Sequence, residues 1–258
     1  MRVKSKDGTE ITCSASGDGP PLVLVHGTGG SAARWEPLLP RLGERFTVYA
    51  MNRRGRGGSG DAEPYAIERE FEDVAALVDS LQDPVNLFGH SFGALCSLEA
   101  SLLTGNLRRL VLYEPAVPVE GEIYPADVVS KLEELLEKEG PEPTLVAFMK
   151  EVVRMPDEEF EMFRKSSAWD ARVAAAHTIP RELRATSQYA FRPARFANMN
   201  IRTMLMMGSE SPPFLTHAAR TVRMALPSAT LAVLDGQQHV AMDTAPDLFL
   251  QTLLDFLG

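Results

Sequence analysis

One serine lies in a sequence context that suits a nucleophile. The pentapeptide Gly89-His90-Ser91-Phe92-Gly93 follows the apolar run 85–88 and leads directly into the helix-forming run 94–100. A strand, a sharp turn and a helix in this order hold a serine in a strained backbone conformation with its hydroxyl exposed. The two glycines have no Cβ, so neighbouring backbone can pack closely around the turn. We therefore predict that Ser91 is a nucleophile.

A serine hydroxyl is a poor nucleophile near neutral pH and needs a base to accept its proton. Among the five histidines, His239 alone follows the last predicted strand, 231–234, and precedes the last predicted helix. A loop in that place reaches the same edge of a sheet as Ser91, so we predict that His239 is the base. The other four lie beside the serine, in an early glycine-rich loop or within predicted helices: His90, His26, His177 and His217.

Two glutamates are candidates for the acid that orients this histidine. Glu114 ends the apolar run 110–113, and Glu210 lies in Gly208-Ser209-Glu210-Ser211-Pro212. A carboxylate at the end of a buried strand is costly without a partner, and His239 can provide one. We therefore prefer Glu114, with Glu210 as the second choice. Weaker candidates flank the histidine in sequence: Asp235 and Asp243.

A glycine-rich loop, His26-Gly27-Thr28-Gly29-Gly30, follows the apolar run 22–25. Its glycines allow the backbone to approach a ligand closely. Acyl transfer at a serine needs two donors for the developing oxyanion, commonly the amide after the nucleophile and one from such a loop. We assign these roles to the amides of Phe92 and Thr28. A phosphate-binding loop is disfavoured because the segment lacks both the GxGxxG spacing and a Gly-Lys-Ser sequence.

Strand and helix signals alternate through most of the chain, which predicts an α/β fold with a mostly parallel sheet. Apolar side chains at helical spacing over 67–81 indicate a helix that packs one face on that sheet. Further helices are expected over 32–42, 94–100 and 247–257. The predicted strands are 22–25, 46–51, 85–88, 110–113, 203–207 and 231–234.

Between Pro115 and about residue 200 the pattern becomes all-helical. Helices are expected over 124–138, 144–155, 157–169 and 171–189, with glycine and proline residues separating them. The insertion follows the strand that ends near Glu114, so it is placed to cover the sheet edge where ligands bind. We predict a core made of 1–115 and 200–258 and a helical cap, or lid, over 116–199.

Composition limits the possible partners. The 26 Lys and Arg against 35 Asp and Glu give a formal net charge of −9, which disfavours nucleic acid and anionic membranes as partners. The start of the chain has no apolar core of signal-peptide length, and no stretch approaches a membrane span. Cys13 and Cys96 are too few for a disulfide framework or a zinc site. We expect a cytoplasmic protein without a metal or cofactor, and nothing indicates its oligomeric state.

These motifs together resemble the α/β-hydrolase superfamily, in its lidded serine-hydrolase branch. The matching segments include the His26-Gly27 loop, the turn at Ser91 and the Gly-x-x-His that ends at His239. Residues 53–60 resemble the family's D-x-R-G-x-G-x-S loop, with Asn52 where an acid is often found. The resemblance covers residues 20–258 apart from the cap.

Most relatives of this kind have their acid after the penultimate strand, as Gly-x-x-Asp. Ser211 occupies that spacing here, and Glu210 comes one residue earlier. Some relatives, including many haloalkane dehalogenases, have a glutamate at the place of Glu114. A serine nucleophile, in contrast, disfavours the dehalogenase and epoxide-hydrolase reactions of this fold, which use aspartate.

The resemblance implies a cofactor-independent serine hydrolase. Its substrate would be a small or medium, largely apolar ester or related acyl compound, and the side chains of Phe92 and Trp169 are expected to contact it. Lactonase, thioesterase, C–C bond hydrolase and perhydrolase chemistry remain open on the same residues, because one fold hosts many reactions. A noncatalytic small-molecule binder is the alternative from another class.

Overall fold

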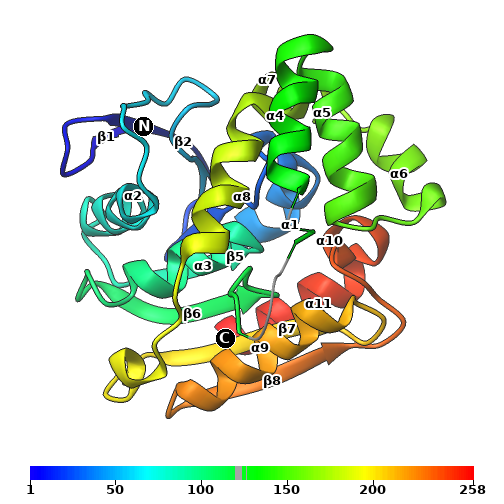
Figure 1. Cartoon of the computed structure of the whole chain (residues 1–258). Helices are drawn as coiled ribbons and strands as arrows, with labels where there is room; N and C mark the ends of the chain where they lie inside the picture. Colours follow the sequence, from blue (N-terminus) through cyan, green and yellow to red (C-terminus); the bar gives the residue numbers. More distant parts are fainter. Residues whose placement is uncertain (120–123, 126) are drawn as a thin grey trace.

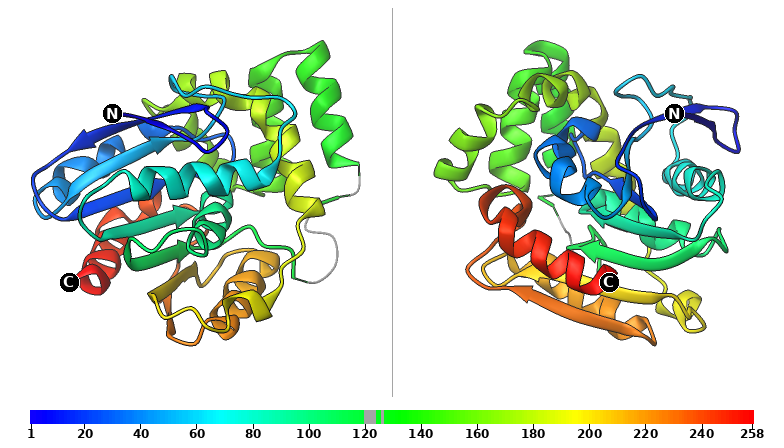
Figure 2. Two further views of the ribbon diagram at one scale, coloured as in Figure 1. Left: turned by 90° about the vertical axis from the view of Figure 1, so that its left-hand side faces the viewer. Right: turned by 180° about the vertical axis from the view of Figure 1, so that it is seen from behind.

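The computed structural model describes residues 1–119, 124–125 and 127–258. Its centre is an eight-stranded sheet of order β1-β2-β4-β3-β5-β6-β7-β8, with helices on both faces (Figures 1 and 2). Along this order, every neighbouring pair from β4 to β8 is parallel. Strand β2 is antiparallel to both of its neighbours, β1 and β4. The strands are β1 (Arg2–Lys4), β2 (Glu10–Ser16), β3 (Pro21–Val25), β4 (Thr47–Asn52), β5 (Val85–His90), β6 (Leu107–Tyr113), β7 (Arg202–Gly208) and β8 (Ala229–Leu234).

Strand β3 shows how the sheet separates two apolar cores. Leu22 and Leu24 pack with residues of the helices on one face, and Val23 and Val25 pack with those on the other. Successive side chains of a strand point to opposite faces, so a strand covered on both sides needs a continuous apolar run. The first face carries a 3₁₀ turn (Ala32–Leu38), α1 (Leu39–Gly43), α10 (Ala241–Thr244) and α11 (Pro246–Leu257), and the second carries α2 (Ile67–Asp79), α3 (Phe92–Ala100) and α9 (Pro213–Ala225).

The two amino-terminal strands were not predicted from sequence. In β2 only Ile11 and Cys13 are fully buried, and the last three residues of the strand are exposed. An edge region that faces solvent needs no continuous apolar run, which was the signal used to find the other strands. The α/β prediction itself, a mostly parallel sheet flanked by helices, is confirmed.

In the described part of the chain, five α-helices lie between β6 and β7 and are named here the cap helices. Positions 120–123 and 126, which belong to the predicted cap, lie outside the described residues. In place of the predicted helix 144–155, the chain forms α5 (Pro141–Ala147) and then a π-helical turn (Phe148–Val152). A 3₁₀ turn at 176–178 divides the predicted helix 171–189, and α8 (Ile179–Gln188) begins after it. Prolines at the first turns of α5 and α8 explain where those two helices begin. The cap helices are α4 (Val128–Lys138), α5 (Pro141–Ala147), α6 (Asp157–Arg164), α7 (Trp169–Ala175) and α8 (Ile179–Gln188).

A buried charge cluster joins the cap helices to the sheet. Glu182 of α8 accepts a hydrogen bond from Arg53 at 2.8 Å and contacts Arg56 as well. Arg53 also donates to Glu70 of α2 at 3.1 Å. Burial alone raises the pKa of Glu182, but the two arginines outweigh it and hold that pKa at about 2. The carboxylate is therefore charged at neutral pH and tied to two buried cations.

We expect Glu182→Ala to lower the free energy of unfolding by about 3–5 kcal/mol, because it leaves buried guanidinium groups without their carboxylate. Urea unfolding followed by circular dichroism measures the change. The matched control is Glu133→Ala, which removes a half-exposed cap glutamate paired with Arg184 and should cost about 0–1 kcal/mol. Equal losses in the two variants would show that the buried cluster does not stabilise the fold.

Candidate active site

Ser91 lies in the turn between β5 and α3. Its backbone angles are φ 57° and ψ −122°, a conformation that costs a non-glycine residue of the order of 1–3 kcal/mol. Its amide donates to the carbonyl of Tyr113 at 2.9 Å, and its carbonyl accepts from the amide of Ala94 at 2.9 Å. At Gly93 an added Cβ would lie 2.4 Å from the carbonyl oxygen of His26, so only glycine fits there. The turn is thus held in the strained form that exposes the serine side chain.

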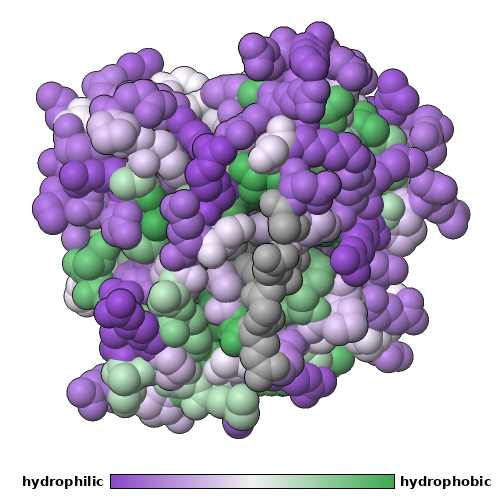
Figure 3. Space-filling view, viewed as in Figure 1, coloured by the Kyte–Doolittle hydropathy of each residue, from purple (hydrophilic) through white to green (hydrophobic). Residues whose placement is uncertain are grey.

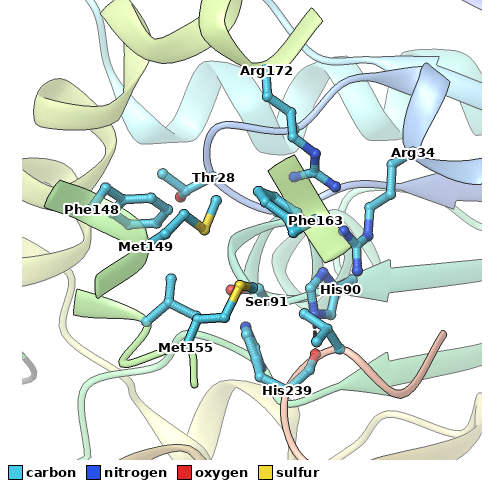
Figure 4. A pocket seen from close by; sticks show the side chains of 14 residues that line it. Thr28, Arg34, His90, Ser91, Phe148, Met149, Met155, Phe163, Arg172 and His239 are labelled. Carbon is cyan, nitrogen blue, oxygen red and sulfur yellow. Dashed lines mark hydrogen bonds between the residues drawn. The ribbon is translucent and has the colours of Figure 1, made fainter. Parts of the chain in front are cut away.

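His239 follows β8 and lines the same cavity as Ser91 (Figure 4). Its Nδ1–H donates to Oε2 of Glu114 at 2.5 Å, which leaves Nε2 free to accept a proton. Among the described residues no hydrogen bond joins this ring to the Ser91 hydroxyl, and such bonds are often long until substrate is bound. The structure thus brings Glu114 to His239, and His239 to the cavity that contains Ser91.

His90 positions the histidine loop. Its Nε2–H donates to the backbone carbonyl of His239 at 2.9 Å, drawn as a dashed line in Figure 4. Burial, together with the nearby His239 ring, lowers the pKa of His90 well below its usual range. The ring is therefore neutral. Its Nε2 is engaged with backbone, whereas its Nδ1 is buried without a hydrogen-bond partner among the described residues. The Glu114 carboxylate bonds to the ring of His239 and not to that of His90.

Glu114 directly follows β6, in a fully buried position with φ 43°. While one carboxylate oxygen accepts from His239, the other accepts from the amide of Gly208 at 2.7 Å, so both oxygens are satisfied. Glu210, the second-choice acid, is exposed, and its amide donates to the carbonyl of Gln237. Of the two glutamates considered from sequence, the structure brings Glu114 to the histidine and leaves Glu210 on the surface.

The glycine-rich loop passes directly beside the serine. An added Cβ at Gly27 would lie 2.9 Å from the Cβ of Ser91, so a side chain at this position would keep the loop away. Thr28 lines the cavity, and Phe92 is the first residue of α3. Amides in the first turn of a helix have no partner within the helix and carry a partial positive charge. The two residues whose amides were assigned to an oxyanion hole thus adjoin Gly27 and Ser91 in the chain, at the place where the loop passes the serine.

The cavity above Ser91 has a volume of about 30 Å³ and is closed mainly by apolar side chains of the cap. A larger neighbouring cavity of about 300 Å³ shares five wall residues with it: Arg34, Met155, Phe163, Arg172 and Val240. The smaller volume holds roughly one water molecule. An acyl substrate therefore requires these shared side chains, most of which come from the cap segment, to move.

Neither side chain predicted to contact substrate lines this cavity. The Phe92 ring lies in the core beneath the guanidinium of Arg53, at 4.6 Å. Trp169 packs edge-on against Phe163, so it supports a lining residue from behind. These two expectations are corrected. Sequence analysis missed the arginines of the lining, Arg34 and Arg172, because an arginine in a helix carries no signal of the direction in which it points.

Other classes of site are not evident in the part of the chain that the structure describes. Cys13 and Cys96 are free and buried. No group of three or more His, Cys, Asp or Glu residues within residues 1–119, 124–125 and 127–258 is arranged to hold a metal ion. Over the same residues, none of the helices has both the length and the apolar character needed to cross a membrane.

Comparison with known families agrees with this geometry. The model of the alpha/beta hydrolase family matches residues 22–252, which is most of the chain. The chain therefore belongs to the alpha/beta hydrolase family, and the resemblance inferred from the motifs is confirmed. A crystal structure of an alpha/beta hydrolase from Sphaerobacter thermophilus is 36% identical and superposes with a TM-score of 0.86, with 100% of each chain covered.

Two named relatives match along nearly their whole length. RutD of Agrobacterium fabrum, provisionally named a carbamate hydrolase, is 27% identical over 96% of this chain and 97% of its own. A 2-(acetamidomethylene)succinate hydrolase of Mesorhizobium japonicum is 27% identical over 93% of this chain and 89% of its own. The family and these names support a hydrolytic enzyme and leave its substrate open.

Proposed function

We propose that this protein is a cofactor-independent serine hydrolase that cleaves a small or medium ester or related acyl compound through an acyl-enzyme. The observation that supports this most directly is the 2.5 Å hydrogen bond from His239 Nδ1 to the buried Glu114 carboxylate, in a cavity that also exposes Ser91. A carboxylate in this place sets the tautomer of the imidazole, so that Nε2 is the basic nitrogen.

The reaction would follow from these positions. Ser91 attacks the substrate carbonyl while His239 Nε2 takes its proton, and the amides of Phe92 and Thr28 stabilise the oxyanion. His239 then protonates the leaving group, which departs and leaves an acyl-serine. Water attacks this ester with His239 again as base, and the proton returns to Ser91 Oγ as the acid product leaves. Glu114 keeps its hydrogen bond to His239 and stabilises the imidazolium.

The helical segment 127–188 is proposed to act as a lid. It covers Ser91 with Phe148 and Met149 of the π-helical turn after α5, with Met155 and with Phe163 of α6. The space left above the serine is too small for an acyl substrate. Binding would displace these side chains, and their return would exclude bulk water. On the face seen in Figure 3 the cap helices are mostly hydrophilic, with hydrophobic side chains visible between them. Several of their apolar side chains are buried, among them Leu132, Phe160 and Leu183.

A fluorophosphonate probe tests the nucleophile independently of the substrate. We expect one adduct per chain, located on Ser91 by peptide mass spectrometry, because the probe reacts only with an activated serine beside an oxyanion hole. Heat-unfolded protein keeps every serine and is the control that should remain unlabelled. An adduct on another residue would refute the nucleophile assignment. Absence of both labelling and ester hydrolysis would favour a noncatalytic binder.

A further inference from the structure

Two buried arginines, one from the core and one from the cap, line the cavity that contains Ser91. Arg34 lies in the 3₁₀ turn after the glycine-rich loop, and Arg172 lies on cap helix α7. The exposed fraction of Arg34 is 5%, and that of Arg172 is 4%. In Figure 4 both guanidinium groups lie on the same side of the cavity, with Phe163 beside them. The cavity wall therefore combines an apolar part with one strongly cationic part.

Arg172 has no acidic partner among the described residues. Its Nε makes no hydrogen bond, and its guanidinium lies over the Phe163 ring at 4.1 Å. Burial, and next the charge of Arg34, lower the pKa of Arg172 to about 9, which still leaves it protonated at neutral pH. An unpaired buried charge is costly, so a residue of this kind is expected where a ligand supplies the missing partner.

The other charged groups nearby do not supply that partner. Asp243 is hydrogen-bonded to Arg34 at 2.9 Å, and its charge also raises the pKa of Arg172, so this one carboxylate offsets one of the two cations. Glu159 lines only the outer cavity, and burial raises its pKa. The histidines that face the inner cavity are His90, which is neutral, and His239, which is bonded to Glu114. Counting the described residues alone, two cations and one carboxylate leave about one uncompensated positive charge in the wall around Arg172.

We propose that Arg172, assisted by Arg34, binds a carboxylate group of the substrate, so that the substrate is an acyl compound carrying one carboxylate besides the bond that is cleaved. The inference rests on the proposed function and deepens it. A guanidinium binds a planar carboxylate through two parallel hydrogen bonds, and one such monoanion matches the single uncompensated charge. Because the arginines come from core and cap, the carboxylate would also hold the cap closed over Ser91.

Matched esters test the substrate class. Monomethyl esters of the C4 to C6 dicarboxylic acids carry the carboxylate on the acyl side, O-acetyl hydroxy acids carry it on the alcohol side, and the corresponding methyl esters are neutral. We expect the wild type to prefer an anionic ester of either series over its neutral partner. Arg172→Met should reduce that preference, measured as a ratio of kcat/KM values, by roughly 10- to 100-fold, mainly through KM. Arg172→Lys should retain part of it.

Two further measurements separate recognition from structure. Glutarate should raise the Tm of Ser91→Ala protein and fail to do so when Arg172→Met is added. Arg172→Met alone should keep or raise the Tm without ligand, because it removes an unpaired buried charge, whereas a structural arginine would lower it. The matched control is Arg184→Met, a cap arginine that is half exposed and paired with Glu133. It should change neither preference nor Tm.

An unchanged ratio of anionic to neutral ester hydrolysis in Arg172→Met would overturn the inference while the proposed hydrolase function stands. Loss of neutral ester hydrolysis in Ser91→Ala tests that function separately. If the wild type cleaves neither ester, the glutarate measurement decides: a Tm shift that depends on Arg172 supports the carboxylate site, and absence of a shift overturns it.

Discussion

Ser91→Ala should lower kcat for p-nitrophenyl butyrate by roughly 10⁴- to 10⁶-fold, the loss found when the nucleophile of a catalytic triad is removed. Alanine has no hydroxyl to form the acyl-enzyme. A water molecule that replaces the hydroxyl is not tethered to the chain and is not held next to His239. Burst-phase release of p-nitrophenol should disappear together with steady-state turnover. Release of p-nitrophenol, followed by absorbance in wild type and variant purified in parallel, measures both.

The control for this variant lies on the helix that begins beside the nucleophile. Ser97 of α3 is buried, and its hydroxyl donates to the carbonyl of Gly93 at 2.7 Å. Ser97→Ala removes another serine hydroxyl, from the helix that follows Ser91, and should keep turnover within a few-fold of wild type. Activity in Ser91→Ala equal to that of Ser97→Ala would exclude Ser91 as the nucleophile. The chain-length profile of active protein would then define the acyl pocket.

Glu114→Gln should lower kcat by roughly 10³- to 10⁴-fold, through the tautomer of His239. The Gly208 amide needs an acceptor, so the carbonyl oxygen of the glutamine takes that bond. Its NH₂ group then faces Nδ1 of His239, which can remain bonded only as an acceptor. The ring proton moves to Nε2, the nitrogen that must be free to take the proton of Ser91.

The same substitution at Glu210 provides the matched control. Glu210→Gln changes an exposed side chain and should leave kcat within a few-fold of wild type. Ester hydrolysis by the two variants, with circular dichroism to verify folding, decides between the glutamates. Loss of turnover in Glu210→Gln with near-normal turnover in Glu114→Gln would reverse the assignment. Glu114→Gln is expected to fold, because the Gly208 hydrogen bond is kept.

The sequence predicted those parts of the fold whose conformation is determined by residues close together along the chain. The strand, turn and helix around Ser91 form from a contiguous segment, so its pattern alone indicated the conformation that is found. Continuous apolar runs identified the strands that are covered on both faces. Glu114 was preferred on a physical argument, the cost of an unpaired buried carboxylate, and the structure places that group against His239.

Features that depend on distant residues were not visible in the same way. The half-exposed strand β2 lacked the apolar run, and the π-helical turn after α5 interrupts a segment that has helical periodicity throughout. Phe92 was expected to face the substrate because of its place in the chain, but its ring packs under Arg53. Periodicity identifies which side of a helix is apolar and does not identify what that side packs against.

The sequence by itself predicted the family, a candidate nucleophile and a candidate base, because short motifs impose one local backbone and these residue types support one chemistry. Only the tertiary structure decided how the site is closed and what lines it. Arg34 and Arg172 are 138 residues apart in the chain and face one cavity because the cap helices fold back over the sheet. The electrostatic interaction of two charges depends on their separation in space, and their separation along the chain does not predict it.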